Sequence, residues 1–185
     1  LGDVYKRQHT DIVTNERGAI VVNDTCESSV PGVYAVGDVN GGPQFTYISL
    51  DDFRIVFGAL TGNGQYTLKD RKNIPYTTFL TPPLARVGLT EEDAINKEYT
   101  VKTKEMLVAT MPRAHVNDYL KGAFKIVVNA DNDLILGATL YSQGAEELIN
   151  LIKMAMDNNI PYTYFKNQIF THPTMAENLN DLCNF

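Results

Sequence analysis

An uninterrupted apolar run that ends in glycine and aspartate is the feature that most constrains the fold of this chain. Residues 33–36 read Val-Tyr-Ala-Val, Gly37 and Asp38 follow, and a Gly-Gly-Pro turn comes next. A short apolar run of this kind is typical of a strand buried on both faces of a parallel sheet. In open α/β sheets, ligands bind just beyond the carboxyl ends of such strands. Gly-Asp at the end of a strand is also common in turns, so the run taken alone favours an ordinary turn, with a ligand site at Asp38 as the alternative.

The complete run resembles the second flavin-contacting motif of flavoproteins with two dinucleotide-binding domains. The resemblance implies that Asp38, next to Gly37, accepts a hydrogen bond from a ribityl hydroxyl of FAD. The helix that follows would direct its amino end, at Gln44, Phe45 and Thr46, toward the pyrimidine edge of the flavin. A helix N-terminus stabilises negative charge, and reduced flavin carries negative charge at that edge.

Composition narrows the classes of function. The chain has 185 residues, 44% of them hydrophobic, and a formal net charge of −6. Its Lys and Arg residues are scattered, so no basic stripe is present to neutralise phosphates and no nucleic-acid partner is expected. No apolar run approaches the ~18 residues of a membrane span, and no signal-peptide pattern opens the chain. We therefore expect no membrane partner and a cytoplasmic location.

The cysteines do not form a recognisable site. Cys26 and Cys183 lie near opposite ends of the chain. Without a short Cys-Cys spacing, sequence neighbours build neither a zinc site nor a two-cysteine redox motif. We expect both to be free thiols and expect no metal site.

A helix is predicted over residues 45–60, because apolar residues recur there at helical spacing and Gly62 follows as a C-terminal cap. The apolar positions are Leu50, Phe53, Phe57 and Leu60. We expect this stripe to pack on the sheet. The charged residues Asp51, Asp52 and Arg54 are expected to face solvent.

Turn-rich and charged segments divide the chain into domains. Residues 1–8 lack periodicity and resemble a translated cloning junction, so they are expected to be non-native. The stretch that runs through Gly62-Asn63-Gly64-Gln65 to Lys69-Asp70-Arg71-Lys72 has the composition of a linker. It separates residues 9–70 from residues 71–185.

The second domain is predicted to be α+β. Alternating or continuous apolar runs predict strands near residues 76–79, 84–87, 101–108, 124–128 and 134–141. Thr90 with the acidic residues after it predicts the start of a short helix. A longer helix is predicted over residues 145–158, with an apolar face wide enough to contact both the sheet and a second subunit.

A histidine motif lies close to the C-terminus. Residues 171–177 read Thr-His-Pro-Thr-Met-Ala-Glu. Thr174 and Glu177 have the spacing of a capping box, so one alternative is that Glu177 only caps a helix and His172 is a surface imidazole. The other alternative is catalysis, because imidazole changes its charge near neutral pH.

The ending His-Pro-Thr-x-x-Glu resembles the acid/base motif of the pyridine nucleotide-disulfide reductases, the group that includes glutathione reductase, lipoamide dehydrogenase and mercuric reductase. The resemblance implies an FAD-dependent NAD(P)H oxidoreductase with a dithiol/disulfide relay, acting on a small-molecule disulfide or a metal ion. It further implies that His172 exchanges a proton with the substrate-facing thiol and that Glu177 fixes its tautomer. Residues 71–185 would form the interface of a homodimer, with His172 entering the partner's active site.

The resemblance covers the chain from about residue 10 to its end. It implies an α/β fragment of an FAD-binding domain followed by an α+β interface (dimerisation) domain with an antiparallel sheet and helices. Residues 44–52 and 178–182 are most similar to the reactive-chlorine-resistance branch, mercuric-reductase-like enzymes proposed to reduce copper(II).

The family's Gly-x-Gly-x-x-Gly fingerprint, its Cys-x4-Cys disulfide and its NAD(P)H domain do not occur in these 185 residues. We therefore expect a C-terminal fragment that is inactive alone. Two alternatives remain: a catalytically inert dimerisation module, and a flavoprotein of the single-cysteine oxidase or peroxidase type. The second type generally lacks the His-Pro-Thr-x-x-Glu ending.

Overall fold

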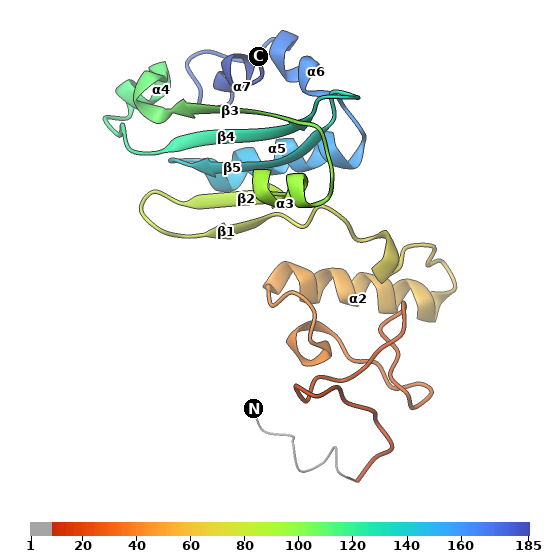
Figure 1. Cartoon of the computed structure of the whole chain (residues 1–185). Helices are drawn as coiled ribbons and strands as arrows, with labels where there is room; N and C mark the ends of the chain where they lie inside the picture. Colours follow the sequence, from red (N-terminus) through yellow and green to blue (C-terminus); the bar gives the residue numbers. More distant parts are fainter. Residues whose placement is uncertain (1–8) are drawn as a thin grey trace. The chain divides into compact units, whose positions relative to one another are not determined.

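A computed structural model describes residues 9–185, which form two units (Figure 1). The first unit ends at Lys72 and the second spans Asn73–Phe185. The octet 1–8, expected to be non-native, lies outside the described residues. Within residues 9–185, no helix combines the length and the apolar character that crossing a bilayer requires.

The second unit is built on a five-stranded antiparallel sheet (Figure 1). Its strands are β1 (Tyr76–Thr78), β2 (Leu84–Gly88), β3 (Val101–Leu107), β4 (Ala123–Asn129) and β5 (Ile135–Tyr141). Their order across the sheet is β1-β2-β5-β4-β3, and each neighbouring pair runs antiparallel. The α+β architecture predicted for the C-terminal part of the chain is therefore confirmed.

The strand β4 forms because large apolar residues recur at every second position, which places them on the same face of a strand. Phe124, Ile126 and Val128 are completely buried, while Lys125 between them is partly exposed. A hairpin joins β4 to β5 and sets Phe124 opposite Leu140. This central pair of strands carries much of the core of the unit.

A bulge interrupts the pairing of β4 with β5. Val127 pairs with Gly137 but Val128 pairs with Ile135, so the register shifts at this point. A Cβ atom at Gly137 would collide with the carbonyl oxygen of Leu89 and lie 2.6 Å from its amide nitrogen. Close backbone packing therefore requires glycine at this position.

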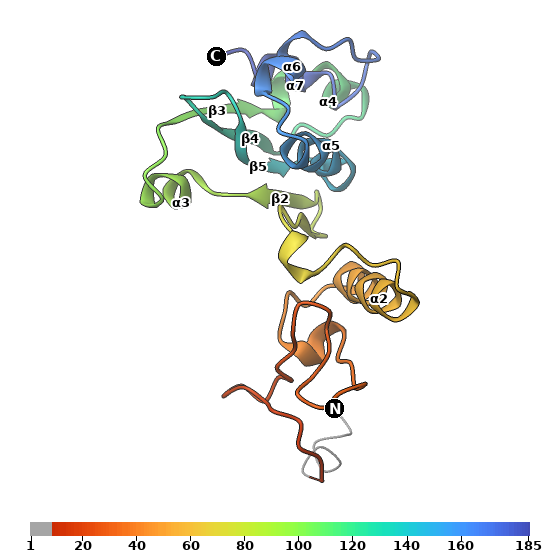
Figure 2. The ribbon, with the colours of Figure 1, turned by 90° about the vertical axis from the view of Figure 1, so that its right-hand side faces the viewer.

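Helices cover both faces of this sheet. They are α3 (Glu91–Asn96), α4 (Pro112–Val116), α5 (Ala145–Asp157), α6 (Tyr162–Asn167) and α7 (Asn178–Leu182). Figures 1 and 2 show α5 along one face of the sheet and α3 over the other. The predicted cap of α3 is confirmed, because Thr90 and Asp93 exchange hydrogen bonds of 2.9 and 3.1 Å. The predicted apolar face of α5 is buried at Leu148, Ile149 and Ile152.

The first unit contains turns, isolated bridges and helical segments. The bridges join Thr14 to Ile20, Val22 to Ser28, and Glu27 to Tyr34. The helical segments are η1 (Gly37–Asn40), α2 (Thr46–Thr61) and η2 (Leu68–Asp70). The predicted buried strand at residues 33–36 is not formed, and Val33 and Val36 are exposed. The physical reason is that no parallel strand among the described residues lies beside this segment to complete its backbone hydrogen bonds.

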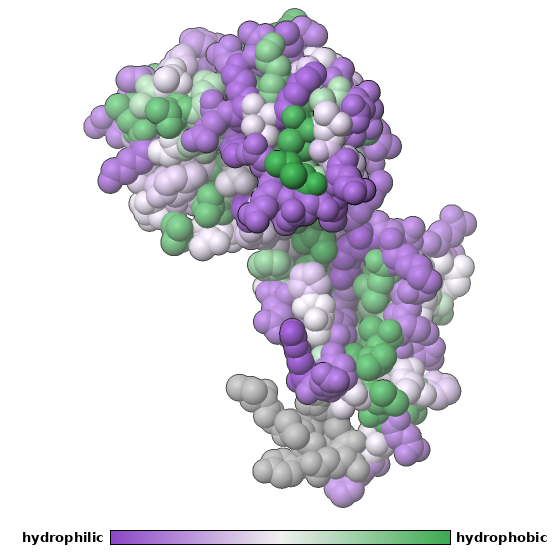
Figure 3. All heavy atoms as spheres, in the orientation of Figure 1, coloured by the Kyte–Doolittle hydropathy of each residue, from purple (hydrophilic) through white to green (hydrophobic). Residues whose placement is uncertain are grey.

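The helix α2 confirms the prediction for residues 45–60 and ends at Gly62, which has a φ of 73°. The expected burial of its apolar stripe is wrong: Leu50, Phe53, Phe57 and Leu60 are all exposed. Figure 3 shows hydrophobic atoms in a band on the surface of this unit. The buried face of α2 consists instead of Ile48, Asp52 and Ile55. Asp52 was expected in solvent, so its burial is a second correction.

Candidate functional site

The Gly37–Asp38 turn presents a carboxylate to solvent. Gly37 is buried with a φ of 70°, and a Cβ atom there would collide with Oγ of Ser49 in α2. A left-handed conformation and this close approach both favour glycine. The next residue, Asp38, is exposed, and no hydrogen bond joins its carboxylate to another residue in the range 9–185. Asp38 is therefore available as an acceptor for an external donor.

A hollow of about 600 Å³ lies beside this carboxylate. Asp38 and Gln44 line it together with the turn at residues 15–19. Phe45 and Thr46 are not among its lining residues; they begin α2, where Phe45 is the N-cap and supplies no side-chain cap. The backbone N–H of Phe45 donates to the carbonyl of Pro43 at 3.1 Å, and the dipole at the start of a long helix favours an anion or a polar ligand. The first unit thus combines a hydroxyl acceptor with a helix start six to eight residues further along the chain.

Behind the turn lies a buried carboxylate that the sequence reasoning missed. Asp52 is 0% exposed and accepts hydrogen bonds from the backbone N–H of Gly37 at 2.7 Å and from Nδ2 of Asn40 at 2.9 Å. It also pairs with Nη2 of Arg71, whose Nε donates to Asp51 at 2.7 Å. One sequence signal points to this burial. Asp52 follows Ile48 by four residues and precedes Ile55 by three, which places all three on one helical face.

The two cysteines are free thiols, as predicted, and the structure buries both of them. Burial raises the pKa of Cys26 to about 11, with Asp52 nearby as a further cause. Burial likewise raises the pKa of Cys183 to about 12. Because the thiolate is the reactive form of cysteine, neither side chain has the character of a redox nucleophile. No group of three or more His, Cys, Asp or Glu residues suited to a metal ion occurs within residues 9–185.

The histidine motif forms a hydrogen-bonded pair in the second unit. Nδ1 of His172 lies 2.7 Å from Oε2 of Glu177. The side chain of His172 is 68% exposed and that of Glu177 is 19% exposed. The hydrogen bond from His172 is the main cause that lowers the pKa of Glu177 below its ordinary range, and the amide of Thr174 adds to it. The structure therefore brings the two predicted residues together, with the outer edge of the imidazole in solvent.

Two asparagines hold the loop that carries His172. Nδ2 of Asn178 donates to the carbonyl groups of Thr174 and Met175, both at 3.1 Å. Nδ2 of Asn180 donates to the carbonyl groups of Phe165 at 2.6 Å and Gln168 at 3.0 Å. Both asparagines belong to α7, so this short helix fixes the loop on either side of His172.

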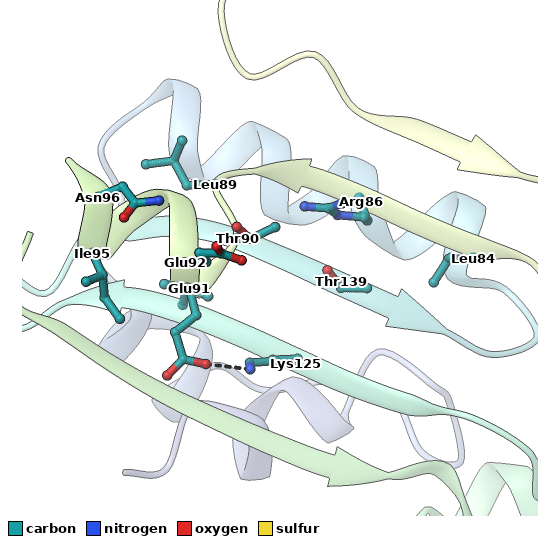
Figure 4. Close-up of a pocket in the computed structure, with 11 residues that line it drawn as sticks. Leu84, Arg86, Leu89, Thr90, Glu91, Glu92, Ile95, Asn96, Lys125 and Thr139 are labelled. Atoms are coloured by element: carbon teal, nitrogen blue, oxygen red, sulfur yellow. Dashed lines mark hydrogen bonds and ion pairs between the residues drawn. The ribbon is translucent and has the colours of Figure 1, made fainter.

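A different hollow, of about 700 Å³, lies where α3 covers the sheet (Figure 4). Glu91 of α3 and Lys125 of β4 form an ion pair of 2.6 Å across it, and Arg86 of β2 also lines it. Neither His172 nor Glu177 lines this hollow. The predicted acid/base pair therefore lies outside it, on the exposed loop before α7.

Comparisons with known proteins agree with both units. Residues 74–183 match the family described as pyridine nucleotide-disulphide oxidoreductase, dimerisation domain. Residues 3–52 match the family described as pyridine nucleotide-disulphide oxidoreductase. The probable pyridine nucleotide-disulfide oxidoreductase RclA of Escherichia coli (strain K12) is 47% identical over 175 residues, covering 95% of this chain and 40% of that protein. A mercuric reductase of Staphylococcus aureus is 33% identical over 168 residues, covering 91% of this chain and 30% of that protein.

Solved structures show the same likeness. The HOCl-induced flavoprotein disulfide reductase RclA from Escherichia coli matches with a TM-score of 0.93 and 46% identity, covering 96% of this chain and 41% of that one. Its Cu(II) complex matches with the same TM-score and identity. The chain spans about 40% of the length of RclA. Because the dimerisation-domain family accounts for residues 74–183, the chain belongs to the pyridine nucleotide-disulphide oxidoreductase family.

Proposed function

We propose that this chain is the C-terminal part of an FAD-dependent NAD(P)H oxidoreductase that works through a dithiol/disulfide relay. In this proposal residues 9–70 complete the flavin site, and residues 71–185 form a homodimer interface and supply His172 and Glu177. The observation that carries the proposal is the 2.7 Å hydrogen bond between these two side chains on a dimerisation domain. The substrate would be a small-molecule disulfide or a metal ion, and the Cu(II) complex of RclA supports the second class.

The residues around Asp38 fit an FAD ribityl chain. The exposed carboxylate of Asp38 can accept a hydroxyl hydrogen, and Gln44 lines the same hollow. Thr46 begins a helix of 16 residues with Phe45 as its N-cap, and the amino end of this helix favours a negatively charged group. Gly37 allows the backbone to turn tightly against α2. When bound, FAD would relay electrons from NAD(P)H to the disulfide.

His172 would move a proton at its Nε2 atom. The hydrogen bond from Nδ1 to Glu177 selects the tautomer in which Nε2 carries the lone pair. The exposed ring can then take a proton from a thiol of the partner subunit and return it later in the cycle. A positioned general acid/base of this kind contributes about 100-fold to 10,000-fold in rate. Glu177 would stabilise the imidazolium while the proton is held.

A second candidate is a dimerisation module without chemistry. Thr174 and Glu177 exchange backbone-to-side-chain hydrogen bonds of 3.0 and 3.2 Å, which is the reciprocal pattern of a capping box. These bonds alone would explain Glu177. In that case the ring of His172 would have no catalytic role.

Turnover of the complete enzyme, meaning the longer polypeptide that we propose contains this chain, separates the two candidates. His172→Gln is expected to lower kcat by about 100-fold or more and to remove a limb of the pH profile. His115→Gln is the matched control, because its ring hydrogen-bonds to the carbonyl of Ala109 at 2.8 Å and not to a carboxylate. Unchanged turnover and an unchanged pH profile in His172→Gln would favour the inert module.

The 185-residue chain alone is expected neither to hold FAD tightly nor to oxidise NAD(P)H. It contains no Gly-x-Gly-x-x-Gly fingerprint for the pyrophosphate and no Cys-x4-Cys disulfide. Purified chain is expected to lack the flavin absorbance band. A bound flavin band together with NADH oxidation above the buffer rate would contradict this expectation.

A further inference from the structure

The buried side chain of Asp52 hydrogen-bonds to the turn on both sides of Asp38, the residue that we propose binds FAD. Oδ2 of Asp52 accepts the backbone N–H of Gly37 at 2.7 Å, one residue before Asp38, and Nδ2 of Asn40 at 2.9 Å, two residues after it. Asn40 extends the contact, because its Oδ1 accepts the backbone N–H of Gly42 at 3.0 Å. The segment from Gly37 to Gly42 is thereby tied to the middle of α2.

Arg71 holds this carboxylate in place. Its guanidinium pairs with Oδ1 of Asp52 and with Oδ2 of Asp51, and its side chain is only 11% exposed. A buried carboxylate needs both a cation and hydrogen-bond donors to offset its lost hydration. Arg71 supplies the charge on one oxygen, which leaves the other oxygen for Gly37 and Asn40. The planar guanidinium directs Nε to Asp51 and Nη2 to Asp52 in a fixed arrangement that an ammonium group lacks.

We infer that Asp52, held by Arg71, is a positioning residue that aims the carboxylate of Asp38 at the ribityl chain of FAD. This inference rests on the flavin role proposed above for Asp38. Asp52 is 0% exposed, so it acts through the backbone of the turn and not by touching the flavin. Replacing it with asparagine leaves one oxygen where two are used and puts an NH2 group against either Arg71 or the amide of Gly37. The turn is expected to loosen while α2 persists.

Amide hydrogen exchange of the 185-residue chain tests whether Asp52 holds the backbone of the turn. In Asp52→Asn, the amide of Gly37 is expected to exchange about tenfold faster, as expected for one lost hydrogen bond. The amide of Ile55, in the buried core of α2, is the internal reference and is expected to keep its rate. Asp51→Asn is the matched control, because Asp51 shares Arg71 but makes no bond to the turn. Equal protection of Gly37 in Asp52→Asn and the parent chain would overturn the inference, and so would an equal loss at Ile55.

Flavin affinity of the complete enzyme tests the functional part. Asp52→Asn and Asn40→Ala are expected to raise the Kd for FAD by about tenfold, while Asp51→Asn stays near the parent value. Asn40→Ala keeps the buried ion pair, so it reports on the turn even if Asp52→Asn fails to fold. If Asp38→Ala loses flavin while Asp52→Asn and Asn40→Ala keep parent-like affinity, the inference about Asp52 is wrong but the proposed role of Asp38 stands. Parent-like affinity in Asp38→Ala would overturn the proposed role of Asp38, and the inference with it.

Discussion

Nδ1 of His172 lies 2.7 Å from one oxygen of the Glu177 carboxylate, and the other oxygen accepts the backbone N–H of Thr174 at 3.0 Å. One carboxylate thus orders the loop and orients the imidazole. These two tasks use different oxygens, so substitutions can separate them. Loss of the loop-ordering contact should lower the free energy of unfolding of the second unit. Loss of the imidazole contact should lower the turnover of the complete enzyme.

The first prediction concerns acid stability. The pKa of Glu177 is lowered, mainly by the hydrogen bond from His172, so its ionised form stabilises the folded chain. This contribution is fully present above the ordinary carboxyl pKa of about 4.3 and is lost as the pH falls through the lower folded value. The free energy of unfolding of the parent chain should therefore exceed that of Glu177→Gln at about pH 6, and the difference should shrink toward about pH 3.

Chemical denaturation at a series of pH values measures this difference. In a His172→Ala background the main cause of the lowered pKa is gone, so the acid-sensitive part of the Glu177→Gln effect should become smaller. A difference that grows on acidification would contradict the sign of the shift.

The second prediction concerns Asn180. Its amide donates to carbonyl groups at the end of α6 and in the connection that follows, so Asn180→Ala leaves several acceptors without a donor. We expect a loss of about 1–3 kcal/mol in the free energy of unfolding, measured by thermal denaturation. Asn150→Ala is the matched control, because its amide makes a single bond of 2.9 Å to the preceding turn of α5. A larger loss in the control would show that Asn180 does not hold the loop.

Local sequence patterns predicted the parts of the fold that depend on near neighbours. The alternation in β4, the Thr90 cap of α3 and Gly62 at the end of α2 each follow from a few consecutive residues. The pairing of His172 with Glu177 is also local, since the two residues are five positions apart. The roles of these two residues came from a resemblance and not from the pattern.

Long-range electrostatics and burial explain why the predicted buried and exposed faces of α2 were wrong. Asp52 is buried because Arg71, 19 positions later, neutralises it and Gly37, 15 positions earlier, donates to it. The hydrophobic periodicity of a single helix does not reveal hydrogen-bond or ion-pair partners that lie so far away in the sequence. The apolar stripe that includes Phe53 and Phe57 suggested the opposite face of α2, yet these rings lie in solvent and contact each other with centroids 5.8 Å apart. A strong local period therefore identified the helix correctly but chose the wrong buried face.

The third prediction concerns thiol reactivity. Burial raises the pKa of Cys26 to about 11 and that of Cys183 to about 12, so the thiolate fraction at pH 8 is on the order of one thousandth or less. A chromogenic disulfide reagent should give almost no signal with the native chain and should label both thiols after unfolding in guanidinium. Cys183→Ser assigns any residual signal. Rapid labelling of Cys26 in the native chain would contradict its burial.

The fourth prediction concerns the bulge between β4 and β5. Gly137→Ala would push a methyl group into the backbone of Leu89, whose amide already donates to Leu136 at 2.9 Å. Backbone there cannot move without disturbing the pairing of β2 with β5, so we expect a loss of about 1–3 kcal/mol in the free energy of unfolding. Gly42→Ala is the control, because its methyl group would meet only the side-chain oxygen of Asn40, at 3.1 Å. Denaturant titration of the two variants should show the larger shift for Gly137→Ala, and an unchanged midpoint in that variant would mean that the strands separate easily at the bulge.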